Sequence, residues 1–510
     1  MTSHLAAALA LLLASTPVLA DAPAAAEVRP TAVDLVSLSD LGGIALSPDG
    51  TRVAWTVRQK TFDPEAKAPA DFDPAKASEA DLKAGWKVTT QLWVAPAERG
   101  EPRQLTFANE APSTPVWSPD GSTLGFLRKK DGKVRIHLLP IGGGEARPLD
   151  TGALEPRAFA FAPDGKSIAF TAAVPLGDAE KKGRWASGGV VRWDREWQAT
   201  ALHTVAIDGG APKAVTTSSV NVVAFDWSPD GKRFAALLSA SSDPYEASSR
   251  VRPAIAAVGE GGEPSITWLE EEPRSFGEIH WSPDGRYVAY DAAVGTLSLL
   301  NQLVVREVGG SGRWNAASRL DPTMQGFAWS GDGGSLLALV ADRTASRIYR
   351  LARDGSSAKD VGFAGRVVRG ALSADRSGRR LAFGSSTPLE PADPTLLDVR
   401  TGRATVLARL NPKAAGWPAV TTEVVSWKNP EGVTIEGLLT LPPGARKGER
   451  LPLWVFPHGG PDDVSQDGFV GWVRFFAARG YAVLRPNYRG STGYGFAFYA
   501  ANRGRLGEVE

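Results

Sequence analysis

A five-residue turn sequence that recurs along the chain constrains its fold more than any other feature. Several copies are spaced by about 43 to 54 residues, which is typical of repeat folds. Pro presets φ at the turn, Asp can bond the nearby backbone, and Gly takes the left-handed conformation after it. The copies are Leu46-Ser-Pro-Asp-Gly50, Trp117-Ser-Pro-Asp-Gly121, Phe161-Ala-Pro-Asp-Gly165, Trp227-Ser-Pro-Asp-Gly231 and Trp281-Ser-Pro-Asp-Gly285, with degenerate forms at Trp329-Ser-Gly-Asp-Gly333 and Leu372-Ser-Ala-Asp375.

Each turn lies between a large apolar residue and an alternating strand such as residues 233–238, which is the pattern of a β-hairpin. A second type of hairpin lies between the copies, for example at residues 91–106 and 203–216, and the sequence holds seven hairpins of each type. Two hairpins make a four-stranded sheet, and seven such sheets in radial array make a propeller. We therefore predict an all-β seven-bladed β-propeller over residues 41–410. The alternatives are another kind of β-repeat or a set of unrelated surface turns.

The pattern changes after residue 410. Residues 411–420 contain two Pro and one Gly and are predicted to be a linker. Strands are predicted at 421–427, 433–441 and 482–486, with a fully buried strand at 453–456 and a helix at 469–479. This order fits the opening strands of an α/β hydrolase sheet. We predict the N-terminal part of an α/β-hydrolase domain over residues 421–510.

The strand at 453–456 leads into the sequence Pro457-His458-Gly459-Gly460-Pro461. Glycine has no Cβ, so Gly459 and Gly460 can present bare backbone N–H groups to a ligand. A loop of this kind supplies half of the oxyanion hole in α/β hydrolases. No Gly-x-Ser-x-Gly occurs in the 510 residues, so we expect the N-terminal part of a hydrolase domain without its nucleophile.

Composition excludes several functions. The formal net charge is +1, from 57 basic and 56 acidic residues, which gives no electrostatic reason to expect nucleic acid or an anionic membrane as partner. Cys is absent, which excludes disulfides, thiolate catalysis and Cys-based metal sites. The five His residues make no close-spaced pair, so no metal site is predicted. We expect no cofactor.

The first twenty residues resemble a secretory signal. Residues 5–14 are apolar but too short to span a bilayer, and Val18-Leu19-Ala20 suits a cleavage site. We therefore predict a signal peptide over 1–20, cleavage after Ala20, and a periplasmic or secreted protein. The alternative is a buried or disordered apolar N-terminus. Residues 21–40 form an N-terminal segment without a strong signal.

Two repeats carry long insertions. Residues 62–87 are rich in Ala, Asp, Lys and Pro and are predicted to be a solvated loop. Residues 174–200 contain Arg192-Trp-Asp-Arg-Glu-Trp197. Aromatic residues beside alternating charges can form a recognition rim or can lie over the apolar edge of a blade. Trp193, Asp194 and Glu196 are therefore candidate substrate-binding residues.

Together these residues resemble the prolyl oligopeptidase family of serine peptidases, in its acylaminoacyl-peptidase and dipeptidyl-peptidase V-like branch. The resemblance rests on the Ser-Pro-Asp-Gly repeats, on His458-Gly-Gly-Pro461 and on Asn487-Tyr-Arg-Gly-Ser-Thr-Gly-Tyr-Gly495; the stretch 192–197 also resembles these members. It implies an enzyme that cuts short peptides under a propeller that excludes large folded substrates. Members have their Ser, Asp and His triad after the segment corresponding to residue 495, so no triad residue is assigned here.

The resemblance transfers one catalytic element, the oxyanion loop. The backbone N–H of Gly459 or Gly460 would act there, with Gly460 preferred; a tight turn without catalytic role is the alternative. His458 is expected to shape this loop rather than to act as general base. Tyr488 and Arg489 are expected near the site, where Arg489 would bind a carboxylate or carbonyl or form a structural ion pair. A free amino terminus of the substrate would need a carboxylate, for which Asp194 and Glu196 are candidates.

These residues lead to three functional hypotheses. The first is a serine peptidase that acts on short peptides. In this hypothesis the present 510 residues are inactive. Their C-terminal part is poorly stable, because its last strand is an unprotected edge. The second is an esterase of the same fold. The third is a non-catalytic propeller that binds a partner and carries the hydrolase segment only as a platform.

Overall fold

The computed structural model describes residues 29–510 apart from 64–84, 99, 108–109, 179–180, 183–197, 242–249, 259–262, 272–274, 294–299, 321–322, 447, 461, 506 and 508–510. The predicted signal peptide lies outside the described residues, as do Trp193, Asp194 and Glu196 and most of the first insertion. Within the described part, no helix is both long and apolar enough to cross a membrane.

The described residues between 40 and 406 form seven four-stranded antiparallel sheets, each built from four consecutive strands. The strands of the first four sheets are β1 (Asp40–Leu46), β2 (Arg52–Phe62), β3 (Trp86–Pro96), β4 (Arg103–Gln104); β5 (Ser113–Trp117), β6 (Thr123–Lys130), β7 (Lys133–Pro140), β8 (Arg147–Pro148); β9 (Pro156–Phe161), β10 (Ser167–Ala173), β11 (Thr200–Ala206), β12 (Lys213–Ala214); and β13 (Asn221–Trp227), β14 (Arg233–Ser239), β15 (Val251–Val258), β16 (Pro264–Trp268).

The strands of the last three sheets are β17 (Ser275–Trp281), β18 (Tyr287–Ala293), β19 (Asn301–Glu307), β20 (Arg313–Asn315); β21 (Thr323–Trp329), β22 (Ser335–Asp342), β23 (Ala345–Ala352), β24 (Ala358–Asp360); and β25 (Val367–Ala374), β26 (Arg380–Ser386), β27 (Asp393–Asp398), β28 (Arg403–Val406). Each recurring turn joins the first two strands of its sheet, as the hairpin prediction required.

The turn chemistry follows the sequence prediction. At the second copy, Ser118 Oγ donates to Asp120 Oδ1 over 2.6 Å, and the same oxygen accepts from Ser122 N over 3.0 Å. Gly121 has φ of 70°, a conformation that disfavours a side chain. Because these bonds all form within five residues, the turn can form before any sheet packs.

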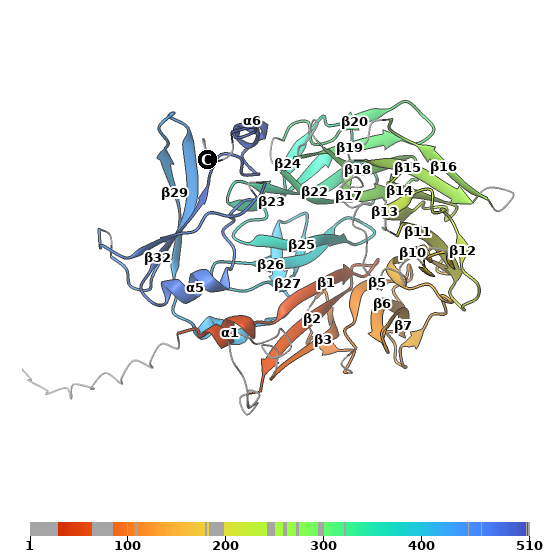
Figure 1. The fold of residues 1–510 in the computed structure, drawn as a ribbon, viewed down its shortest axis with the longest axis horizontal. Coiled ribbons are helices and arrows are strands. Elements are labelled where there is room, and N and C mark those ends of the chain that lie inside the picture. The colour runs from red at the N-terminus through yellow and green to blue at the C-terminus, as the bar shows by residue number, and fades with distance from the viewer. Residues whose placement is uncertain are drawn as a thin grey trace, which may run out of the picture.

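The seven sheets follow one another in space as well as in sequence. Each sheet contacts the next, and β1 contacts β25 and β26 (Figure 1). Leu46 N donates to Ser373 Oγ over 2.9 Å and Arg376 N donates to Pro48 O over 2.9 Å, which joins the first sheet to the seventh. We call these seven sheets the sheet ring.

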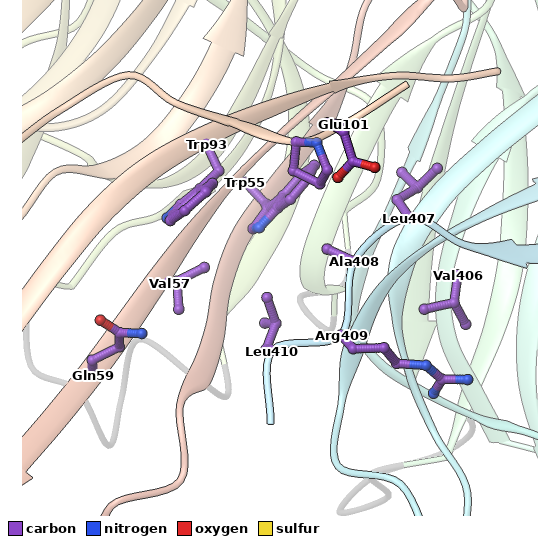
Figure 2. A pocket seen from close by; sticks show the side chains of 11 residues that line it. Trp55, Val57, Gln59, Trp93, Glu101, Val406, Leu407, Ala408, Arg409 and Leu410 are labelled. Carbon is purple, nitrogen blue, oxygen red and sulfur yellow. The ribbon is translucent and has the colours of Figure 1, made fainter. Parts of the chain in front are cut away.

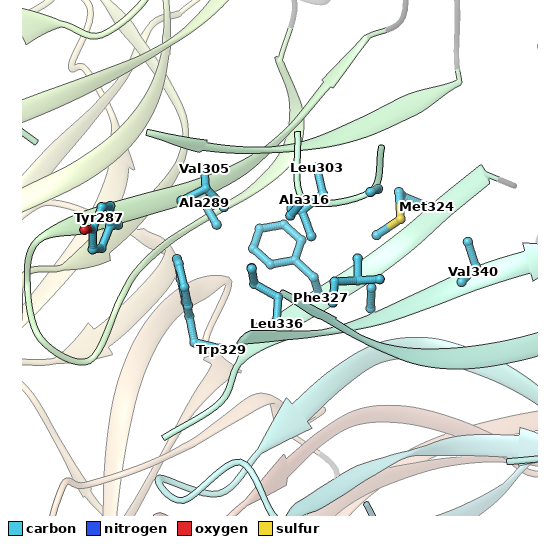
Figure 3. Packing of buried hydrophobic residues seen from close by; sticks show 13 residues of the cluster. Tyr287, Ala289, Leu303, Val305, Ala316, Met324, Phe327, Trp329, Leu336 and Val340 are labelled. Carbon is cyan, nitrogen blue, oxygen red and sulfur yellow. The ribbon is translucent and has the colours of Figure 1, made fainter. Parts of the chain in front are cut away.

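The core of the sheet ring consists of apolar clusters between neighbouring sheets. Figure 3 shows the cluster between the fifth and sixth sheets, where Phe327 and Trp329 meet Leu303 and Val305. The first strand of every sheet carries a break in its ladder with the second strand. Such bulges bend a strand and redirect its side chains.

An eighth sheet follows the 3-10 helix η1 (Pro412–Gly416). Its strands are β29 (Thr421–Lys428), β30 (Thr434–Leu441), β31 (Leu453–Val455) and β32 (Ala482–Asn487), in the order β29-β30-β32-β31. β31 and β32 are parallel, and α5 (Gly471–Ala477) connects them. α6 (Phe496–Ala500) follows β32, and α1 (Ala32–Val36) contacts α5. This C-terminal sheet lies to one side of the sheet ring (Figure 1).

Two sequence predictions about the C-terminal sheet are wrong. The strand at 453–456 was expected to be fully buried, but Leu453 is 55% and Val455 50% exposed. The last strand along the chain, β32, was expected at the edge, but it lies between β30 and β31. Both errors have one cause: β31 pairs with β32 alone and so takes the edge position, which no local pattern reveals.

Candidate active site at the glycine loop

The glycine loop, residues 457–460, directly follows β31. Gly460 has φ of 123°, and a Cβ there would lie 2.4 Å from Asp462 N, so this position requires glycine. A Cβ on Gly459 would meet no atom within 4 Å. Both residues are exposed, and neither of their amides donates a hydrogen bond to any described residue. The loop therefore presents two N–H groups that have no acceptor among the described residues.

His458 holds the loop in place. Its Nδ1 lies 3.0 Å from Gly459 O, and because a carbonyl can only accept, Nδ1 donates this bond. Its Nε2 lies 2.9 Å from Ser491 Oγ. Since the C=O and N–H of a trans peptide point in opposite directions, fixing Gly459 O turns Gly460 N–H away from the imidazole. This geometry agrees with the shaping role expected for His458.

Tyr488 ties the glycine loop to the loop after β32. Its ring stacks on the His458 imidazole with centroids 4.6 Å apart, and its hydroxyl donates to His458 O over 2.7 Å. Ser491, which is fully buried, donates from Oγ to Tyr488 O over 2.6 Å. The sequence prediction placed Tyr488 near the site and missed Ser491, whose only signal is its place inside the Tyr-Arg-Gly-Ser motif.

Asn487, at the end of β32, holds the loop after β32 in place, and the sequence prediction also missed it as a functional residue. Its side chain is fully buried. Its Oδ1 accepts from Ser465 N over 2.7 Å, and its Nδ2 donates to Ser465 O over 3.1 Å and to Tyr494 Oη over 3.0 Å. A polar residue at the end of a buried strand was the available signal.

Arg489 is engaged in an ion pair. Its guanidinium is buried and pairs with the Glu431 carboxylate, which lies on the turn between β29 and β30. This is the structural arrangement that the sequence left open beside substrate binding. Glu431 is 58 residues away along the chain, so no local pattern could have selected it.

The loops of the site contact the sixth sheet of the ring. Arg343 N donates to Gly493 O over 2.9 Å, and Gly493 N donates to Thr323 Oγ1 over 3.1 Å. Asp467 N also donates to Thr344 O over 2.8 Å. The loops of the C-terminal sheet therefore rest on the start of β21 and on the turn between β22 and β23.

Arg474 of α5 joins three segments. It is 2% exposed, and its Nη2 donates to Pro418 O over 2.9 Å while its Nη1 donates to Leu389 O over 3.2 Å. Weaker contacts reach Pro388 O and Trp417 O. Burial lowers the pKa of this guanidinium. One side chain thus connects the C-terminal sheet, the predicted linker and the loop between β26 and β27.

A sizeable cavity lies away from the glycine loop. It has a volume of about 630 Å³ and opens between the first and seventh sheets, lined by Trp55, Trp93 and residues 406–410 (Figure 2). None of its lining residues belongs to the C-terminal sheet. In the part of the chain that the structure describes, no three His, Asp or Glu side chains are grouped so that they could hold a metal ion.

Comparison with known proteins agrees with this arrangement. The model of the prolyl oligopeptidase family matches residues 469–510. Dipeptidyl-peptidase 5 of Porphyromonas gingivalis is 23% identical over 505 residues, which cover 90% of this chain and 68% of that protein. The uncharacterized peptidase YuxL of Bacillus subtilis is 24% identical over 512 residues, covering 94% of this chain and 73% of that protein.

Among solved structures, the acylaminoacyl peptidase of Pyrococcus horikoshii superposes with a TM-score of 0.68 at 15% identity, covering 91% of this chain and 68% of that one. At this identity the likeness shows the fold. The sequence matches show that the chain resembles the prolyl oligopeptidase family of peptidases, including dipeptidyl-peptidase 5, and its fold is similar to that of an acylaminoacyl peptidase.

Proposed function

We propose that this chain is the propeller and the first part of the α/β-hydrolase domain of a serine peptidase that hydrolyses short peptides. In this proposal the seven sheets of residues 41–410 are the blades of a seven-bladed β-propeller, residues 411–420 are the linker, and residues 421–510 begin the hydrolase domain. The observation that carries the proposal is the pair of amides at Gly459 and Gly460, which have no acceptor among the described residues and are held by His458 beside loops that rest on the sheet ring.

The Gly460 N–H is the proposed oxyanion donor. Its peptide plane is fixed by the bond from His458 Nδ1 to Gly459 O, so the donor needs little reorganisation when charge develops on a substrate oxygen. One such donor is worth about 2.7–4 kcal/mol of transition-state stabilisation, or on the order of 10²–10³ in rate. His458 positions this donor and does not act as general base.

The nucleophile is not assigned to any of the 510 residues, because they contain no Gly-x-Ser-x-Gly. We expect the purified 510-residue chain neither to react with a fluorophosphonate probe nor to hydrolyse peptide–arylamides. A product that also includes the sequence encoded downstream should do both. Labelling of the 510-residue chain itself would contradict the proposal. If neither product is labelled, the non-catalytic binding protein is favoured.

Matched substrates separate the peptidase from the esterase. The two substrates share one peptide and differ only in an amide or an ester at the cleaved bond. A peptidase cleaves both, and an esterase cleaves only the ester.

Export is proposed together with this function. N-terminal sequencing of the protein from its native host should then give a sequence that begins at Asp21.

A further inference from the structure

Arg369 stands at a bulge of β25, the first strand of the seventh sheet. The ladder between β25 and β26 breaks between Arg369 and Ser373, and Gly370 has φ of 80°. Because a bulge redirects the side chains around it, this strand can turn a long side chain out of the sheet. Arg369 is exposed, and β25 is an edge strand of its sheet, paired only with β26.

The side chain extends to the hydrolase segment. A Cβ placed on Gly468 would lie 2.7 Å from Arg369 Nη2, so the guanidinium lies over a residue with no side chain. Asp467, the preceding residue, donates from its backbone N to Thr344 O of the sixth sheet over 2.8 Å. Arg369 therefore lies at the seam where the sheet ring meets the C-terminal sheet.

No described carboxylate lies within ion-pair distance of this guanidinium. The charge of Asp463 acts on the guanidinium, but Asp463 Oδ1 accepts from Val464 N over 2.8 Å instead. Burial lowers the pKa of Arg369, and Asp463 only partly offsets this effect. The positive charge of Arg369 thus has no bonded carboxylate among the described residues.

A second cation strengthens the positive field. Arg485 of β32 is 6% exposed, and its Nε has no hydrogen-bond partner among the described residues. Burial lowers the pKa of Arg485 to about 10, Asp467 opposes that shift, and Arg369 adds to it, so the two guanidinium groups are close enough to repel. Asp467 does not reach ion-pair distance of either one, and its Oδ1 is also without a partner.

The position of Arg369 relates it to the candidate site. Asp463 is the third residue after Gly460, and its carbonyl accepts from Thr492 N over 3.0 Å, in the loop that also carries Tyr488 and Ser491. The cation therefore faces the chain that continues from the glycine loop. By contrast, the guanidinium of Arg489 is already occupied by Glu431.

We propose that Arg369 binds a carboxylate of the peptide, so that the site prefers short peptides with a free C-terminal carboxylate. A guanidinium suits this role because its planar fork matches a carboxylate and keeps its charge at every working pH. The proposal rests on the proposed peptidase function and adds the chemical class of the substrate. An acidic side chain offers the same chemistry as the C-terminus, and the experiment separates the two.

The test measures binding, which does not need the nucleophile. The 510-residue chain is titrated by calorimetry with Ala-Ala-Ala, with its C-terminal amide, and with Ala-Glu-Ala amide. We expect the free acid to bind about tenfold more tightly than the amide, as a charge-assisted bond provides. The Glu peptide amide should resemble the plain amide if the C-terminus is the ligand. The affinity of the Glu peptide amide should instead resemble that of the free acid if any carboxylate can bind Arg369. In that case the site would select acidic residues and not the C-terminus.

Variants assign the effect to one residue. Arg369→Gln should bring the acid to the affinity of the amide and leave the amide unchanged. Arg369→Lys should keep part of the preference, and Asp463→Asn should enlarge it by removing a competing carboxylate. Arg376→Gln is the matched control: Arg376 lies on the turn after β25 and donates to Pro119 O, away from the C-terminal sheet. Its preference should equal that of the unaltered chain.

The outcomes separate the two proposals. If the acid and the amide bind equally well, or if Arg369→Gln keeps the preference, the inference about Arg369 is overturned while the peptidase proposal stands. If no peptide binds the unaltered chain at millimolar concentration, the peptide-binding function itself fails and the inference fails with it. Thermal unfolding of each variant confirms that the folded state is kept.

Discussion

The sheet ring and the C-terminal sheet use similar strands but bury them differently. In β14 of the ring, the six residues after Arg233 are all buried. In β31, Leu453 and Val455 are exposed and only Trp454 is half-buried. A ring sheet has a neighbouring sheet on each side, whereas β31 has a strand on one side only. An apolar strand sequence therefore permits burial, and the number of neighbouring strands and sheets decides how many of its side chains are buried.

The largest expected difference comes from removing apolar side chains. Phe327→Ala in the ring should lower the free energy of unfolding by about 3–5 kcal/mol, because Phe327 is 3% exposed within a packed cluster. Val455→Ala should cost less than about 1 kcal/mol because that side chain is half exposed. Urea unfolding followed by tryptophan fluorescence measures both. Equal losses would show that the two regions do not differ in packing as described.

Arg474 tests how firmly the two regions are joined. Arg474→Met removes donors from carbonyls of residues 389 and 418, and should lower the free energy of local opening by about 3 kcal/mol. Hydrogen exchange should then quicken in residues 411–420 and 469–487 while the ring stays protected. Arg479→Met is the control, because the Arg479 side chain donates to Phe475 O of its own helix region and, among the described residues, to no other segment. Unchanged exchange in Arg474→Met would mean that apolar contacts alone join the regions.

Asp291 tests burial inside the ring by its pH dependence. Burial, together with the Glu278 charge, raises the pKa of Asp291 from 3.8 to about 7. The folded protein therefore holds this proton up to about pH 7 while the unfolded chain releases it near pH 4, so stability falls as pH rises through that window. Asp291→Asn, which keeps the acceptor for Glu278 N, should remove a stability difference of about 2–4 kcal/mol between pH 4 and pH 8. Urea unfolding at pH 4 to 8 measures it, and an unchanged slope would exclude Asp291 as its source.

Substitutions in the glycine loop should have a modest effect on stability, and the effect should differ clearly between Gly459 and Gly460. Gly460→Ala forces a side chain into φ of 123° and against Asp462 N, at a cost of about 1–3 kcal/mol. Gly459→Ala meets open space and should be nearly neutral. Hydrogen exchange of residues 456–466 compares the two variants. A larger effect at Gly459 would reverse the assignment of the constrained position.

The recurring turns were predictable because every interaction that forms them is local. Ser118, Asp120 and Ser122 lie within five residues, so their sequence already contains the bonds that close the turn. The glycine loop was predictable for a related reason, since glycine readily takes a positive φ that other residues disfavour. The degree of exposure of β31 was not predictable, because it depends on which strand pairs with it.

The partners of the charged residues were not predictable either. Arg489 was expected near the site, but Glu431 on another hairpin decides that its guanidinium is occupied. Arg369 carried no signal in the sequence, since one Arg in a strand near Gly370 resembles many others. Its position over Gly468 depends on residues 99 positions apart meeting at the seam between the two regions.

By itself, the sequence determined the seven repeated hairpin turns, the change of pattern after residue 410 and the glycine loop, because each depends on backbone preferences and bonds within a few residues. The tertiary structure decided which strand lies at an edge, which carboxylate meets which guanidinium, and how the glycine loop rests on the sheet ring. Those outcomes depend on burial and charge contributed by distant segments, and such contributions exist only after the chain has packed.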